Sequence, residues 1–282
     1  MKTSFKRIVK ALCVTATAVV LGACGGASST VDPFKPTRVI GLGDGYNAWV
    51  TVTGTGEVET VVGQVAALFG VSNIQNNAAT TPVLISQLSS QLSGLTFSPS
   101  DLVLISIGTG DIQAAYTAQD PIAAAETAAA SLATAIENML TQGASHILVM
   151  QALEFSTTPY ARANSGTYPL NTNSSPTVAF NAKVSALLQT YISHAGYRNN
   201  PVIFGGMGLS SDFNNYTSYA TYGAFTTSTQ TPYCGSTSLN VTCSVGAATY
   251  DTTLFGDGLY LTPAGNRWVA QYLFNATAQG WR

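Results

Sequence analysis

Three short segments of the chain combine glycines with acidic or phenolic side chains. The segments are 42–46, 108–112 and 255–266. Each carries a carboxylate, at Asp44, Asp111 and Asp257 respectively. A carboxylate in such a place can orient a base, activate a water molecule or contact a ligand. The three segments are therefore the first candidates for chemistry in this sequence.

The surrounding pattern predicts where these segments lie in the fold. Short β-branched runs alternate with helical patterns, which is typical of a parallel sheet with crossover helices. The expected strands are Arg38–Leu42, Leu102–Ile107, His146–Met150 and Val202–Phe204. The expected helices are Val58–Phe69, Pro82–Leu92, Pro121–Thr141, Pro176–His194 and Pro263–Ala278. The first two segments follow predicted strands, and in open α/β sheets the carboxyl ends of strands carry the ligand sites.

The order and spacing of the three segments resemble the SGNH/GDSL esterases and lipases, whose blocks read Gly-Asp-Ser-Leu, Gly-x-Asn-Asp and Asp-x-x-His. The similarity covers nearly the whole chain after its leader, and it is greatest to secreted proteobacterial phospholipase and esterase members. It implies an α/β three-layer sandwich, flavodoxin-like, with a central, mostly parallel sheet flanked by helices. It also implies acyl transfer by a serine, a histidine and an aspartate, with backbone and asparagine donors for the oxyanion.

The chain departs from that family pattern at the catalytic positions. Gly45 stands at the nucleophile, and Tyr260, a poor base at neutral pH, stands at the histidine. Gly110 replaces the oxyanion asparagine, and the block expected to supply a glycine donor reads Asn76–Ala79 without a glycine. Only Asp257 of the triad is retained. No catalytic set is intact, and neither a metal nor a cofactor is expected.

Other interpretations of these residues remain open. The glycines of 43–45 and 108–111 suit tight turns without any chemical role. The residues expected to contact a ligand, if one binds here, are Asp44, Tyr46, Asp111 and Tyr260. Neither histidine is placed to serve as a base, because His146 begins a predicted strand and His194 ends a predicted helix.

The N-terminus has the pattern of a lipoprotein signal peptide. Four basic residues precede an apolar run, Ala11–Leu21, that is too short to span a bilayer. The run leads to Cys24 in a sequence that resembles a bacterial lipobox; an ordinary secretory signal is the alternative. The predicted organisation is a signal peptide at 1–23, a Gly/Ser/Pro-rich tether at 24–36 and one domain at 37–282.

Composition limits the partners and the compartment. Only 9% of the residues are charged, and no basic cluster follows the first ten residues, which excludes nucleic acid as a partner. Removing the signal peptide takes the formal net charge from −2 to −6, so membrane attachment is expected only through the lipid. Gly25 after Cys24 favours the outer membrane, and the expected location is the cell envelope. Oligomeric state is not predicted.

Two cysteines remain for the folded part. Cys234 and Cys243 are expected to form a local disulfide in an oxidising compartment, since their spacing and the lack of a nearby histidine make a metal pair a poor interpretation. They lie in an aromatic, Ser/Thr/Gly-rich region, 210–253, that is predicted to be a long loop. This loop is a candidate lid or recognition surface.

Three functions are compatible with the sequence. The first is a non-catalytic, lipid-anchored protein that binds an acylated lipid or a glycan on an esterase fold. The second is an active ester hydrolase with rewired residues, in which Asp44 or Asp257 activates water directly. The third is a structural or partner-binding module whose cleft is filled, and in that case the side chains of Tyr46 and Tyr260 are expected to occupy the cleft.

Overall fold

The computed structural model describes residues 33–54, 59–193, 200–205, 209–246 and 248–281. The predicted signal peptide, Cys24 and His194 lie outside these ranges. The folded unit begins at Phe34, three residues before the predicted start at position 37. Its ring stacks on His146 with centroids 3.6 Å apart, and its backbone N–H donates to the Trp281 carbonyl at 3.0 Å.

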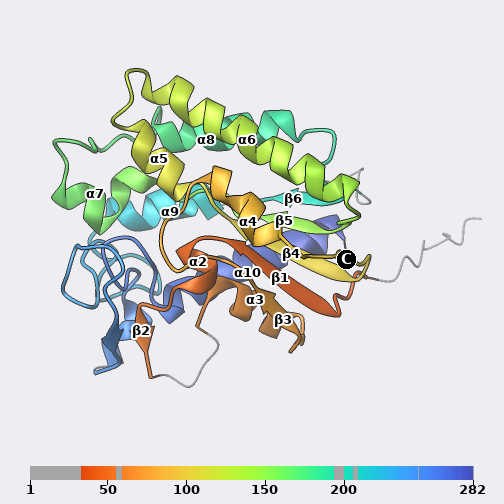
Figure 1. Ribbon diagram of the computed structural model, residues 1–282. Helices are drawn as coiled ribbons and strands as arrows, with labels where there is room; N and C mark the ends of the chain where they lie inside the picture. Colours follow the sequence, from red (N-terminus) through yellow and green to blue (C-terminus); the bar gives the residue numbers. More distant parts are fainter. Residues whose placement is uncertain (1–32, 55–58, 194–199, 206–208, 247, 282) are drawn as a thin grey trace, which may run out of the picture. The chain divides into compact units, whose positions relative to one another are not determined.

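The centre of the fold is a sheet of five parallel strands in the order β3-β1-β4-β5-β6 (Figure 1). The strands are β1 (Arg38–Gly43), β3 (Ile74–Asn76), β4 (Asp101–Ser106), β5 (Ile147–Val149) and β6 (Val202–Phe204). All of β4 and all but the first residue of β1 are buried, as their apolar runs predict. The four predicted strands are confirmed. Strand β3 was not predicted, because its three residues are mostly exposed and carry no apolar run.

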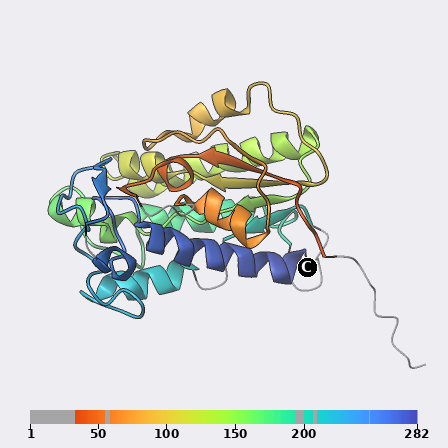
Figure 2. The ribbon, with the colours of Figure 1, turned by 90° about the horizontal axis from the view of Figure 1, so that it is seen from below.

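Helices cover both faces of this sheet, which confirms the predicted three-layer α/β arrangement. Helices α6 and α8 pack together on one face, and α3 and α10 pack together on the other (Figures 1 and 2). The helices are α2 (Gly45–Ala48), α3 (Val61–Leu68), α4 (Leu88–Leu92), α5 (Thr109–Ala115), α6 (Pro121–Thr141), α7 (Pro159–Ala163), α8 (Pro176–Leu187), α9 (Leu209–Ser218) and α10 (Pro263–Gly280). Three 3₁₀ turns, η1 (Ile85–Gln87), η2 (Phe155–Thr157) and η3 (Ala248–Thr252), complete the set.

Helix α6 shows how residues at the two ends of a helix determine where it begins and ends. The Asp120 side chain accepts from the Ala123 N–H at 3.0 Å, and Pro121 occupies the first turn. Gly143 follows the helix with a φ of +98°, which favours glycine over residues with a side chain. Both ends match the predicted bounds.

Tertiary contacts changed three predicted elements. Helix α8 ends at Leu187 because Tyr191 and Ser193 pair with the backbone of Val202 at the sheet edge. The helix predicted over Pro82–Leu92 is divided into η1 and α4. The region 210–253 is not all loop: α9 occupies its start, and β7 (Cys243–Ser244) pairs with β2 (Val52–Thr53) in a second, small sheet.

Candidate functional site

The first segment forms a tight turn at the carboxyl end of β1. Gly43 has a φ of +107°, and a Cβ atom there would lie 1.8 Å from the Ser106 carbonyl oxygen, so only glycine fits. The side-chain amide of Gln91 bonds to both the N–H and the carbonyl of Gly43, at 2.7 and 2.8 Å. This turn places Asp44 in the interior with no exposed surface.

The ring of Tyr260 occupies the space beside Gly45. A Cβ atom on Gly45 would lie 2.1 Å from Cζ of Tyr260, far inside van der Waals contact. Tyr260 is fully buried, and the Tyr46 ring meets it edge to face at 5.3 Å. The Tyr46 hydroxyl donates to the Leu259 carbonyl at 3.3 Å. The volume that a nucleophilic side chain at position 45 would need is therefore filled by tyrosine.

Tyr260 is also chemically unsuited to act as a base. Burial raises the pKa of Tyr260 far above its ordinary value, and the charge of Asp44 is the second largest cause of this rise. The Gly45 N–H lies near enough to lower that pKa somewhat, yet the Tyr260 hydroxyl has no hydrogen-bond partner of normal geometry among the described residues. Tyr260 thus stays neutral and cannot take a proton from a nucleophile at neutral pH.

Asp44 is a buried carboxyl with weak compensation. Burial raises the pKa of Asp44 to about 8, and the charge of Asp111 adds to this rise. The Tyr46 N–H and the Thr109 hydroxyl lower the pKa in part. Neither reaches normal hydrogen-bond geometry, and both carboxyl oxygens are without a partner in the described part of the chain. At neutral pH Asp44 is consequently largely protonated.

Asp257 organises its own loop instead of orienting a base. Its Oδ1 accepts from the N–H groups of Leu259 and Tyr260 at 2.8 and 2.6 Å. Its Oδ2 accepts from the Val241 N–H at 3.1 Å, across to the disulfide-bearing region. Burial raises the pKa of Asp257, and these N–H groups lower it. Both oxygens are engaged by the backbone.

The second segment opens helix α5. A Cβ atom on Gly110 would lie 2.9 Å from the Val83 carbonyl oxygen, so an asparagine at this position requires a backbone shift. Asp111 accepts from the Ile85 N–H at 3.0 Å, and burial raises its pKa. The segment before η1 therefore packs over this turn.

The amides of the 76–79 block are engaged within the fold. The Ala79 N–H donates to the Gly43 carbonyl, and the Asn77 N–H donates to the Gly41 carbonyl, both at 2.9 Å. These bonds extend the pairing of β3 with β1. The two N–H groups consequently lack a free direction toward an oxyanion.

The structure thus brings together Asp44, Gly45, Tyr46, Asp111, Tyr260 and Asp257, with Gly110 in the adjacent turn. His146 does not join them, because it lies before β5 at the amino end of the sheet, and burial lowers its pKa. No histidine among the described residues reaches the turn at Gly45.

The predicted disulfide lies in the 210–253 region, next to the loop of Asp257. Cys234 and Cys243 are joined with an S–S distance of 2.02 Å, which confirms the predicted pair. Within the described ranges, no group of three or more His, Cys, Asp or Glu side chains is arranged to hold a metal ion. Over the same residues, no helix is long and apolar enough to cross a membrane.

Two charged residues with defined polar surroundings were not predicted. Glu154 is buried and accepts hydrogen bonds from the hydroxyls of Ser156 and Ser175 at 2.8 and 2.6 Å. Arg162 lines a polar cavity near the end of α9. The sequence offered one indication of these two residues: charged side chains make up only 9% of the chain, so each of them is a candidate for a specific role.

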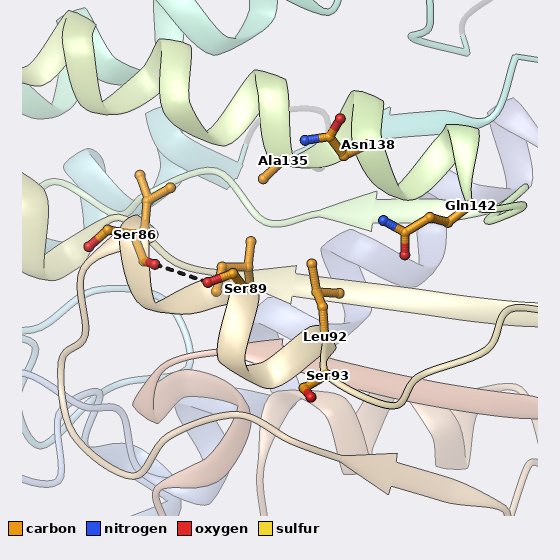
Figure 3. A pocket seen from close by; sticks show the side chains of 9 residues that line it. Ser86, Ser89, Leu92, Ser93, Ala135, Asn138 and Gln142 are labelled. Carbon is orange, nitrogen blue, oxygen red and sulfur yellow. Dashed lines mark hydrogen bonds between the residues drawn. The ribbon is translucent and has the colours of Figure 1, made fainter.

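A separate cavity of about 450 Å³ lies between α4 and α6 (Figure 3). Its wall mixes serines with leucines; Asn138 faces it from α6, and Gln142 faces it from the position directly after that helix. No residue of the three glycine-containing segments lines this cavity. It is distinct from the turn at Gly45.

Two solved structures of other proteins are similar to this chain. A candidate GDSL-like lipase of Parabacteroides merdae has a similar fold, with a TM-score of 0.52 and 13% identity over 88% of this chain and 99% of that one. The phospholipase A1 of Streptomyces albidoflavus gives a TM-score of 0.47 and 15% identity over 86% of this chain and 99% of that one. A search of curated proteins finds no match.

The sequence comparison extends over most of the fold. Residues 41–273 match the family described as GDSL-like lipase/acylhydrolase. This range contains the three glycine-containing segments, both cysteines of the disulfide and the whole of the central sheet after its first residues. The protein therefore belongs to the GDSL-like lipase and acylhydrolase family.

Proposed function

We propose that this protein is a catalytically inactive member of its family that acts at the cell envelope by binding another molecule, with a glycan as the favoured ligand. The observation that carries the proposal is the Tyr260 ring, which fills the space beside Gly45. A nucleophile is missing at Gly45, and the residue at the base position is a neutral, buried phenol. Loss of one triad member alone lowers the rate of such hydrolases by roughly 10⁴–10⁶-fold.

The filled position also bears on where a ligand binds. In this proposal Tyr46 and Tyr260 fill the space that an acyl ester would need beside position 45, and their burial and ring contact support a partner-binding module over a protein that holds an acyl chain in the family's cleft. Binding is then expected at the loops around the carboxyl ends of the strands. Their side chains are mostly polar and uncharged, which suits a glycan better than a lipid.

Attachment to the envelope is part of the proposal. It is supported by the basic residues, the short apolar run and the lipobox-like sequence that ends at Cys24. The folded unit begins at Phe34, beside His146 and Trp281 at the amino end of the sheet. The turn at Gly45 is at the opposite, carboxyl end of β1. A lipid on Cys24 would attach the domain through the segment of chain that precedes Phe34.

The rewired hydrolase is the second candidate, and one observation favours it. A pKa of about 8 would let Asp44 exchange a proton near neutral pH. Its carboxyl group has no exposed surface, however, and both Asp257 oxygens are bonded to backbone N–H groups. Water activation by either residue would require the loop to open.

Ester hydrolysis by the purified protein separates the two candidates. The substrates are p-nitrophenyl butyrate and a longer acyl ester, and the variants are Asp44→Asn and Asp257→Ala. We expect the wild type to hydrolyse these esters no faster than buffer alone. Turnover by the wild type that either variant abolishes, with the variant still folded by circular dichroism, would contradict the proposal.

A further inference from the structure

We infer that Arg162 and the polar loop beside it form a binding site for an acidic saccharide, a sugar that carries a carboxylate or a phosphate. The site is a cavity of about 360 Å³ between η2, α7, the 170–173 loop and the end of α9. It is lined by Thr157, Arg162, Leu170, Asn171, Thr172, Asn173 and Ser218. Six of these seven side chains are polar, and Arg162 is the one that carries charge.

Arg162 is held in place without a counter-charge. Its Nε donates to the Thr157 carbonyl at 2.9 Å, and its Nη2 donates to the Thr217 carbonyl at 2.6 Å. Both acceptors are neutral, and no described acid forms an ion pair with Arg162. The arginines at 38 and 267 and the lysine at 183, by contrast, each pair with an acid.

The uncompensated charge favours an anion. Arg162 is only partly exposed, and its burial lowers the pKa of the guanidinium. Removing a cation from water without pairing it costs free energy, and a bound anion would offset that cost. Nη1 and the second N–H of Nη2 make no hydrogen bond in the described part of the chain. A guanidinium with free N–H groups suits the oxygens of a carboxylate or a phosphate.

Neighbouring groups in the cavity suit hydroxyls. The Asn171 side chain is committed to the loop, since its Oδ1 accepts from the N–H groups of Asn173 and Ser174 at 3.2 and 3.0 Å. The side chains of Thr172 and Asn173 make no hydrogen bond to the described residues. They leave one hydroxyl and one amide, each able to donate and accept, beside the guanidinium. This combination fits a hydroxyl-rich ligand better than an acyl chain.

An exposed aromatic pair follows Ser218 in the sequence, and neither of its rings is among the residues that line the cavity. Tyr219 directly follows Ser218 and is 60% exposed. Its ring stacks on Tyr222, with planes 14° apart and centroids 5.6 Å apart. The Thr229 hydroxyl donates to the Tyr219 carbonyl, which fixes this part of the loop. The hydroxyl and the amide beside Arg162 favour a saccharide over a bare anion. An exposed aromatic ring next to Ser218 in the sequence is of the kind on which the apolar face of a sugar stacks.

Arg162 also has a structural contact, which the test must separate from binding. Its bond to the Thr217 carbonyl secures the last turn of α9, so Arg162→Gln can change stability as well as affinity. Asn173→Ala removes a side chain that makes no bond to the described residues of the fold. Arg267→Gln is the matched control, because it removes a positive charge outside the cavity.

The experiment is calorimetric titration of the purified protein with glucuronate, glucose 6-phosphate, glucose and inorganic phosphate. We expect one or both acidic sugars to bind at least about tenfold tighter than glucose and than inorganic phosphate. Arg162→Gln should weaken that binding about tenfold or more, and Asn173→Ala roughly threefold with an unchanged melting temperature. Arg267→Gln should bind like the wild type. Comparison of the affinities for glucuronate and glucose 6-phosphate shows whether the site prefers a carboxylate or a phosphate.

Several results would overturn the inference: no binding of either acidic sugar, wild-type affinity in both Asn173→Ala and Arg162→Gln, or inorganic phosphate binding as tightly as the sugars. The inference rests on the binding role proposed above, and ester hydrolysis measured on the same samples keeps the two apart. Ester hydrolysis by the wild type would contradict the proposed inactive role, but it would not change the conclusion that the titration gives about the Arg162 site. Absence of both hydrolysis and sugar binding would overturn the Arg162 site alone.

Discussion

Cζ of Tyr260 lies 2.1 Å from the point where a Cβ atom on Gly45 would sit. The two residues are therefore mutually dependent: the ring can occupy its buried position only because position 45 has no side chain. In the proposed inactive role, this one packing arrangement takes the place of the serine and the histidine that the resemblance to the family predicts at positions 45 and 260.

This dependence predicts coupling between two substitutions. Gly45→Ser should destabilise the protein by about 1–3 kcal/mol through overpacking. The same change in a Tyr260→His background should cost less, because the shorter ring withdraws the clashing atoms. Urea unfolding of the four proteins gives the coupling free energy, which we expect at about 1–3 kcal/mol. Gly166→Ala is the control, since nothing lies within 4 Å of the point where its Cβ atom would sit; additive effects would refute the coupling.

Asp44 should make stability fall as the pH rises. Its pKa is about 8 in the folded state against 3.8 as the ordinary value, so the folded state holds the extra proton between these values. Unfolding free energy then decreases with pH over this window, by up to about 1.4 kcal/mol per unit. Asp44→Asn removes this contribution and should reduce the slope measured by urea unfolding at pH 4–8, while the raised pKa values of Asp111 and Asp257 maintain part of it. A wild-type slope in Asp44→Asn would contradict this prediction.

Asp257 is expected to matter for stability rather than turnover. Replacement by alanine leaves the N–H groups of Leu259, Tyr260 and Val241 without their acceptor, at about 1–3 kcal/mol for each buried group that water cannot reach. Asp257→Asn keeps one acceptor oxygen and should lose less. Thermal unfolding checks both variants. Unchanged melting temperatures would show that the loop does not depend on this carboxylate.

The disulfide should stabilise the paired segments β2 and β7. Cys234 and Cys243 close a loop with a sequence separation of 9, for which chain entropy predicts roughly 2–3 kcal/mol. Reduction should lower the melting temperature, and the double variant Cys234→Ser/Cys243→Ser should melt lower and no longer respond to the reductant. A wild type that melts equally with and without dithiothreitol would exclude this role.

The sequence by itself determined the architecture and the family. Apolar β-branched runs are buried on both faces wherever they occur in a parallel sheet, so the four strands that carry such runs, β1, β4, β5 and β6, were predictable without tertiary information. Local capping residues likewise defined helix α6, from Asp120 to Gly143. That position 45 has no side chain able to act as a nucleophile was visible as well, because it depends on residue type alone.

Only the tertiary structure decided what fills the site and which charges lack partners. The resemblance to the family predicts that Tyr260 stands at the position of the base, but the placement of its ring beside Gly45 depends on the course of a loop that is distant in the sequence. Helix α8 was shortened because backbone pairing with Val202 outcompetes helix propensity. Likewise, only the fold shows that Arg162 forms no ion pair with a described acid. Such features arise from long-range packing, which local sequence patterns do not encode.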